Sequence, residues 1–150
     1  MDAKVTWNGD LDFVGIADSG FPIRISSPSG ADKGIGPVEM TILALAACTA
    51  MDVVSILEKK KERVEEFQVL VHAERAGTYP KVITSAKLEY VVTGRRVREA
   101  SLRRAIELSV EKYCPVHAML SKAFPIELNF AIHEGGAGSD RGPALYGRCD

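Results

Sequence analysis

The first part of the chain alternates between short apolar runs and turn sequences. Residues 5–9, 11–17 and 21–26 are rich in β-branched and aromatic side chains, which favour strands. The sequences NGD and DSG separate these runs and are typical of hairpin turns. The pattern therefore predicts three short strands joined by two hairpins.

The next segment, 37–61, has the pattern of a long helix. Residues 40–50 are apolar on every side of such a helix, which predicts that it is enclosed on all faces. Pro37 suits the first turn, where its missing N–H is not needed. The segment ends in a basic run, and cations are favourable near the negative end of the helix dipole.

The remaining pattern predicts an α+β protein. Apolar and polar side chains alternate along 67–73 and 82–92, as in half-buried antiparallel strands. Segments 98–113 and 115–123 have helical spacing, and a last alternating strand follows Pro125. The predicted order of elements is βββ–α–ββ–αα–β.

Length and composition indicate one domain followed by a tail. The chain has 150 residues and a hydrophobic share of 46%, which suits a single core. Nothing in the sequence divides residues 1–133. Residues 134–150 read EGGAGSDRGPALYGRCD, and a segment so poor in apolar surface is predicted to be a mobile tail.

Charge and hydropathy exclude several classes of protein. The 19 basic and 20 acidic side chains give a formal charge of −1, whereas nucleic-acid binders and polybasic membrane-surface proteins need a basic excess. The longest uncharged apolar stretch, 40–51, has 12 residues, against the ~20 of a membrane span. The first ten residues lack the apolar core of a secretion signal. Few cysteines and no C-x-x-C motif predict a cytoplasmic protein.

Two of the three cysteines are candidates for chemistry. Cys48 lies in the middle of the long helix and is either a small buried hydrophobe or a nucleophile that needs an activating group from elsewhere. Cys114 precedes Pro115, so it is expected to cap a helix, where backbone N–H groups lower a thiol pKa. By this local argument Cys114 is the more acidic thiol. Cys149, in the predicted tail, is interpreted as an incidental thiol.

If the helices carrying Cys48 and Cys114 lie on one face of a sheet, the two thiols can meet. Two close thiols in a reducing compartment suggest redox chemistry, in which one forms a sulfenic acid and the other converts it to a disulfide. Asp52 is expected to be paired in the helix packing, because an unpaired buried charge is costly. His117 is interpreted as a packed or solvent-facing side chain. A zinc site of Cys48, Cys114 and His117 lacks a fourth ligand, so no metal is expected.

Two sequence motifs resemble one known family. The segment GPVEMTILALAACTAMDVVSIL, at 36–57, and the segment RAIELSVEKYCPVHAML, at 104–120, are similar to the OsmC/Ohr family of osmotically inducible and organic hydroperoxide resistance proteins. The PKV sequence at 80–82 occurs in the family's order between them, and the resemblance covers roughly residues 3 to 133. It implies the OsmC-like fold with a long buried central helix, in an intertwined homodimer.

The resemblance also implies a function. Cys48 matches the peroxide-attacking thiol, and Cys114 matches the resolving thiol. Glu39 is expected near the mouth of the site as a third catalytic residue. The implied activity is thiol-dependent reduction of organic hydroperoxides in oxidative stress defence. The implied reductant is a dithiol such as dihydrolipoamide, and no metal, haem or flavin cofactor is implied. The alternative is a non-peroxidatic relative that binds a small apolar or sulfur-containing ligand.

Two positions depart from the strongest peroxidases of that family. Their arginine near the first hairpin has no counterpart here, because the region reads WNGDLDF. Arg24 and Arg75 are the available strand cations, and both are interpreted as surface or interface charges. Glu39 is shifted by one residue, and its alternative interpretation is a first-turn carboxylate on the helix dipole. We therefore expect slow peroxide reduction. The apolar surroundings of Cys48 on the helix predict an apolar pocket, which would favour bulky organic peroxides.

Overall fold

The structure, a computed structural model, describes residues 1–27, 34–136 and 145–149. Its contacts gather in two compact units, Met1–Leu43 and Ala44–Asp150, and each unit is described by itself. The sequence predicted one undivided body over residues 1–133. That expectation stays a prediction.

The first unit is a small antiparallel sheet of strands β1 (Ala3–Gly9), β2 (Asp12–Ala17) and β3 (Pro22–Ser26), in that order. Gly9 and Gly20 have φ of 114° and 77°, which glycine adopts at no steric cost, and they form the predicted turns. The two expected hairpins are thus confirmed. Several large apolar side chains of this unit are exposed: Val5, Trp7, Phe21 and Ile23.

Helix α1 (Pro37–Lys59) confirms the strongest helix prediction, but this chain alone does not enclose it. Its buried side chains recur every four residues and form one stripe: Leu45, Thr49, Val53 and Leu57. Met51 is 74% exposed. Enclosure on all faces is expected of the intertwined homodimer, and it stays a prediction. By length and composition α1 could also cross a membrane, a test that core helices pass as well.

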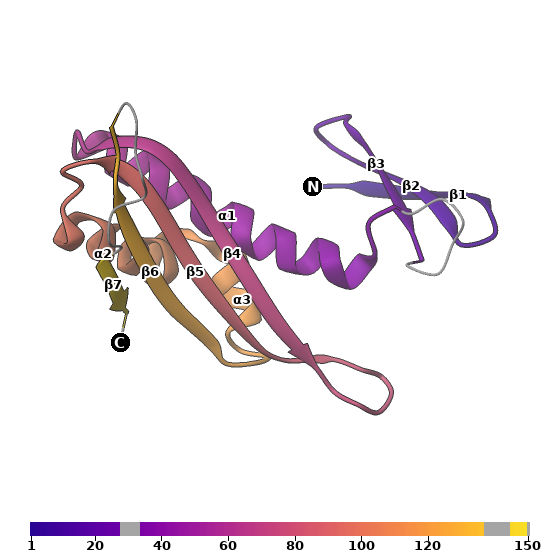
Figure 1. Cartoon of the computed structure of the whole chain (residues 1–150). Coiled ribbons are helices and arrows are strands. Elements are labelled where there is room, and N and C mark those ends of the chain that lie inside the picture. The colour runs from indigo at the N-terminus through magenta and orange to yellow at the C-terminus, as the bar shows by residue number, and fades with distance from the viewer. Residues whose placement is uncertain (28–33, 137–144, 150) are drawn as a thin grey trace. The chain divides into compact units, whose positions relative to one another are not determined.

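The second unit is built on a four-stranded sheet of β4 (Arg63–Arg75), β5 (Ile83–Arg95), β6 (Ile126–Glu134) and β7 (Leu145–Arg148), in that order. Strands β4 and β5 are antiparallel, β5 and β6 are parallel, and β6 and β7 are antiparallel. The parallel pair requires a crossover, which the helices between β5 and β6 supply (Figure 1).

Strand β7 lies within the segment that the sequence predicts as a tail. Residues Leu145–Arg148 pair with β6, and the backbone N–H of Cys149 donates to the Leu128 carbonyl at 3.2 Å. Gly147 packs against the Phe130 ring so closely that a Cβ would overlap it. Backbone pairing therefore orders a segment whose composition alone indicated mobility. Residues 137–144 and 150, also part of that prediction, lie outside the described residues.

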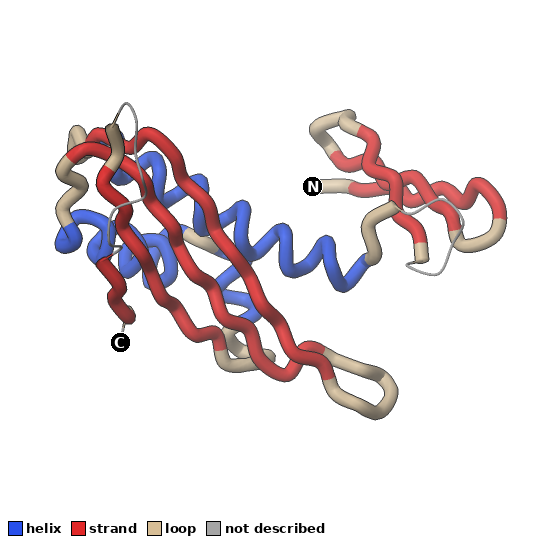
Figure 2. Tube along the Cα trace, viewed as in Figure 1, coloured by secondary structure: helices blue, strands red, loops and turns tan. Residues whose placement is uncertain are grey.

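The helices of the second unit cover one face of its sheet (Figure 2). They are the latter part of α1, α2 (Glu99–Leu108), the π-helix η1 (Ser109–Tyr113) and α3 (Pro115–Leu120). Their apolar side chains and those of β5 and β6 form the core, which includes Leu57, Leu88, Tyr90, Ile106 and Phe130. The predicted α+β class is confirmed, with one more strand than expected.

Candidate active site

Two thiols and a carboxylate meet inside the second unit. Sγ of Cys48, Sγ of Cys114 and a carboxylate oxygen of Asp52 all lie within 4.8 Å of one another. Cys48 and Asp52 come from consecutive turns of α1, and Cys114 joins η1 to α3. The packing of these helices on one face of the sheet therefore brings together the two cysteines, as the sequence predicted.

Cys48 lies at the margin of the buried stripe of α1. Thr49, beside it, is fully buried, whereas Ala47 is exposed and Cys48 itself is half-buried. The Thr49 hydroxyl donates to the backbone carbonyls of Leu45 and Ala46, so it does not donate to the Cys48 thiol. Cys48 thus combines contact with Cys114 and a path to solvent.

Cys114 occupies the helix N-cap that the sequence predicted. Its Sγ accepts a hydrogen bond from the backbone N–H of His117 at 3.3 Å, and Pro115 follows at the first position of α3. Its own backbone N–H donates to the Ser109 carbonyl at 2.7 Å, closing the π-helical turn. The residue is only 2% exposed.

The predicted acidity of Cys114 was wrong. Burial first, and then its hydrogen bond with Cys48, raise the pKa of the Cys114 thiol to about 12, against the smaller effect of the His117 N–H. A cap of two backbone N–H groups lowers the thiol pKa less than burial raises it. The argument from the helix N-cap failed because it did not include the burial of Cys114, which a local sequence pattern does not show.

Asp52 has a hydrogen-bonding partner from another helix. The Ser109 hydroxyl donates to Oδ2 of Asp52 at 2.9 Å, and Ser109 is fully buried. The expectation that Asp52 is paired in the helix packing is met by this bond. Sequence reasoning did not place Asp52 or Ser109 in the site. The available signal was the four-residue spacing from Cys48 to Asp52, which puts both on one side of α1.

His117 contributes its backbone to the site. Burial lowers the pKa of its imidazole, against a hydrogen bond to the Val110 backbone. Its Nδ1 is buried and has no hydrogen-bond partner in the described part of the chain.

Tyr90, on β5, is fully buried near Thr49, Cys114 and Asp52. Burial raises the pKa of its hydroxyl.

Glu39 and the two candidate arginines have other contacts. Oε2 of Glu39 accepts a hydrogen bond from the Gly36 backbone N–H at 2.8 Å, which closes the first turn of α1. Arg24 pairs with Asp12 at 2.9 Å, and Arg75 donates to the Lys81 carbonyl at 2.9 Å. These contacts agree with the interpretation of both arginines as surface charges.

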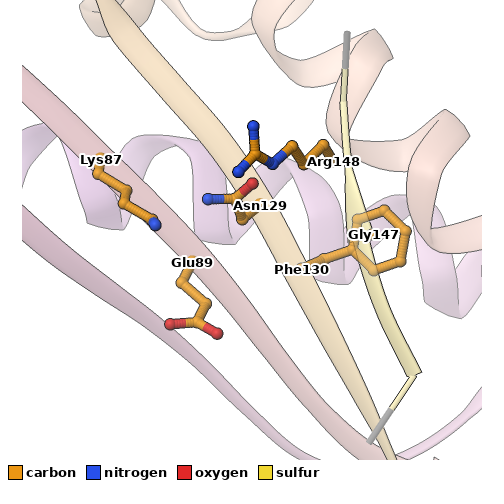
Figure 3. Close-up of a pocket in the computed structure, with 6 residues that line it drawn as sticks. All are labelled: Lys87, Glu89, Asn129, Phe130, Gly147 and Arg148. Atoms are coloured by element: carbon orange, nitrogen blue, oxygen red, sulfur yellow. The ribbon is translucent and has the colours of Figure 1, made fainter.

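A hollow of about 470 Å³ lies on the sheet face away from the helices (Figure 3). Lys87, Glu89, Asn129 and Arg148 line it together with Phe130 and Gly147. It contains no thiol, and its charged lining differs from the apolar pocket expected beside Cys48. The volume of this hollow therefore does not make it the candidate active site. We take the pair of thiols, Cys48 and Cys114, as the candidate active site of this unit.

Comparisons with known proteins identify a family and its relatives. The family described as OsmC-like protein matches residues 30–129. Protein YhfA of Escherichia coli K12 is 40% identical over 132 residues, which cover 88% of this chain and 98% of its own length.

Two solved structures share the fold at low identity. An OsmC-like protein from Mycoplasma pneumoniae is 20% identical with a TM-score of 0.75, covering 87% of this chain and 95% of that chain. The organic hydroperoxide resistance protein OhrB of Bacillus subtilis is 17% identical with a TM-score of 0.58, covering 87% of this chain and 98% of that chain.

Proposed function

The chain belongs to the OsmC-like protein family, and on that premise we propose that it is a thiol-dependent peroxidase. It reduces organic hydroperoxides through a reversible disulfide between Cys48 and Cys114. The observation that carries the proposal is the approach of the two sulfurs to within 4.8 Å in a family whose fold is shared by a hydroperoxide resistance protein.

In the first step the Cys48 thiolate attacks one oxygen of the hydroperoxide. A sulfur–oxygen bond forms, the O–O bond breaks, and the alkoxide leaves and takes up a proton to become an alcohol. Cys48 is oxidised to a sulfenic acid, and the peroxide is reduced. Access supports this assignment, because Cys48 is half-buried while Cys114 is 2% exposed.

In the second step Cys114 attacks the sulfur of the Cys48 sulfenic acid. The disulfide forms, and hydroxide leaves and becomes water with the Cys114 proton. The raised pKa of Cys114 suits this role, since a protonated thiol stays unreactive toward peroxide until the sulfenic acid is beside it. Cys114 lies at the junction of η1 and α3. This position supports the small movement of its sulfur toward the Cys48 sulfur that a disulfide requires.

A dithiol reductant such as dihydrolipoamide then completes the cycle. It donates two electrons and two protons, restores both thiols and leaves as its own disulfide. No metal or organic cofactor takes part in these steps. We propose that the enzyme acts as a homodimer in the cytoplasm, where thiols are kept reduced. The exposed apolar face of α1 around Met51 supports self-association. The catalytic role expected of Glu39 is untested, and its bond to the Gly36 N–H favours a role at the start of α1 instead.

The proposal is tested by counting thiols in a Cys149→Ser background. The reduced protein is mixed with a slight excess of cumene hydroperoxide, and free thiols are titrated before and after. We expect the loss of two thiols per chain and their recovery with dihydrolipoamide. If cumene hydroperoxide removes no free thiols, the peroxidase proposal is wrong, and the alternative of a protein that binds a small ligand is favoured.

Single-cysteine variants then assign the roles. Cys48→Ser is expected to show no sulfenic acid with a trapping reagent. Cys114→Ser is expected to give one trapped sulfenic acid per chain and no turnover. If Cys48→Ser is trapped and Cys114→Ser is inert, the two roles are reversed. Circular dichroism of each variant serves as the control for folding.

A further inference from the structure

We infer that Cys48, Cys114 and Asp52 form a zinc-binding site in the reduced protein. The inference goes beyond the proposed peroxidase activity, since the metal takes no part in peroxide reduction. It rests on one observation: two thiol sulfurs and a carboxylate oxygen, contributed by two separate helices, lie within 4.8 Å of one another. Zinc binding needs only these three groups and does not depend on the peroxidase proposal.

The distances suit a tetrahedral ion. Zinc binds thiolate sulfur at about 2.3 Å and carboxylate oxygen at about 2.1 Å, so two sulfurs on one ion are about 3.8 Å apart. Donor atoms that already lie within 4.8 Å of one another therefore need to close by about 1 Å or less. Side-chain rotation can supply a change of that size without repacking the helices.

The surrounding hydrogen bonds orient two of the three ligands. The Ser109 hydroxyl donates to Oδ2 of Asp52, and the carboxylate keeps further lone pairs for a metal. The His117 backbone N–H donates to Sγ of Cys114 and so partly offsets the charge of a bound thiolate. Hydrogen bonds of this kind to ligand atoms raise metal affinity about 10-fold to 100-fold. Asp52 and Ser109, which the peroxide steps leave unused, thus acquire a function.

The ligand types select the metal. Two thiolates favour zinc over magnesium and calcium, which prefer oxygen ligands. Three protein ligands leave one tetrahedral position open. Cys48 is half-buried, so the ion has a path from solvent, whereas Cys114 and Ser109 are buried and close the other side. The site therefore resembles an accessible, reversible metal site rather than an enclosed structural one.

Zinc in this position would block both thiols. A thiolate bound to zinc has less electron density for attack on a peroxide, and a disulfide cannot form while the ion separates the sulfurs. Binding releases the protons of the two thiols, and zinc itself is neither oxidised nor reduced. The expected effect is reversible protection of the reduced pair.

The test measures zinc binding directly on the full chain. Reduced Cys149→Ser protein is titrated with Zn²⁺ against a chromophoric chelator, without peroxide. We expect one ion per chain, loss of two titratable thiols, and with Co²⁺ a thiolate-to-cobalt absorption band. Oxidised protein is expected to lose this binding, because its sulfurs form a disulfide.

Variants identify the ligands. Cys48→Ser and Cys114→Ser should each lower zinc affinity roughly 100-fold, and Asp52→Asn roughly 10-fold. Ser109→Ala keeps all three ligands but removes the donor to Asp52, and should lower affinity about 10-fold. Glu127→Gln changes an exposed carboxylate elsewhere and should have no effect.

Two results would overturn the inference. One is zinc binding that survives Cys48→Ser unchanged, which would mean an adventitious surface ion only. The other is unchanged affinity in both Asp52→Asn and Ser109→Ala, which would remove the carboxylate from the site. Peroxide reduction measured with a chelator present reports on the peroxidase proposal alone, so either proposal can fail without the other.

Discussion

The hydroxyl of Ser109 donates a 2.9 Å hydrogen bond to Oδ2 of Asp52, and this bond joins η1 to α1 beside the two thiols. Ser109 is fully buried, and its backbone carbonyl also accepts the N–H of Cys114. One residue therefore fixes both the carboxylate and the backbone of the second cysteine. The helix pair carrying the thiols is positioned by polar contacts as well as by apolar packing.

Removing the Ser109 hydroxyl is expected to destabilise the protein. Ser109→Ala leaves a half-buried carboxylate without this donor, which costs about 1–2 kcal/mol. Urea unfolding followed by circular dichroism measures the change. Asp52→Asn keeps an acceptor for Ser109 and is the matched control, expected to lose less stability than Ser109→Ala. Equal stability of wild type and Ser109→Ala would contradict a structural role for the bond.

A charge at Met51 is expected to prevent self-association. Met51 is 74% exposed on an otherwise apolar part of α1, and burying a charge in an apolar interface is costly. Sedimentation at micromolar concentration should give a dimer for the wild type and a monomer for Met51→Glu. Leu70→Glu, on a 51% exposed side chain of β4, is the control and should stay dimeric. A monomeric wild type would contradict the proposed dimer.

Glu39 is expected to act mainly at the start of α1. Its Oε2 accepts the Gly36 N–H, and glutamine retains an oxygen that can accept this bond. Glu39→Gln should therefore keep both stability and the rate of Cys48 oxidation within about twofold, whereas Glu39→Ala should lose about 0.5–1 kcal/mol. Stopped-flow oxidation and thermal melts measure the two effects. A much slower Glu39→Gln with unchanged melting would instead give the carboxylate a catalytic role.

Stability at acid pH is expected to depend on Glu62. Burial acts to raise the pKa of its carboxyl, but hydrogen bonds from Ser101 and Arg98 outweigh burial and lower that pKa below 4.5. The unfolded chain therefore binds this proton first as pH falls. The stabilising contribution is complete above about pH 4.5 and is lost as pH falls through the folded-state pKa.

The matched experiment compares wild type with Glu62→Gln. The variant should be about 1 kcal/mol less stable at pH 7. Its unfolding free energy should also fall less steeply than that of wild type below pH 4.5. Urea unfolding at a series of pH values gives both quantities. Parallel pH profiles would show that Glu62 does not titrate differently in the folded and unfolded chains.

Gly94 is expected to tolerate no side chain. A Cβ there would overlap the Arg63 carbonyl oxygen and lie 2.8 Å from Cγ2 of Val97. Gly94→Ala should therefore cost about 2–3 kcal/mol through overpacking. Gly77 has open space around a Cβ and is the control, so Gly77→Ala should change stability by less than about 0.5 kcal/mol. Similar melting temperatures of the two variants would contradict this steric argument.

Some features were determined by the sequence itself. The two hairpins, the long helix, the alternating strands and the N-cap at Cys114 all follow from local patterns, because turn residues, apolar periodicity and a Pro at the first helical position act over a few residues. The family motifs also located Cys48 and Cys114 before any distance was known.

Tertiary structure decided the rest. The order of Leu145–Arg148 depends on pairing with β6, which composition does not encode. The high pKa of Cys114 arises from burial beside Cys48, and the partnership of Asp52 with Ser109 joins residues on different helices. Desolvation and hydrogen bonding between distant residues depend on which surfaces meet in the fold. Residue spacing identified the two thiols, and only their packed environment made one buried and the other accessible.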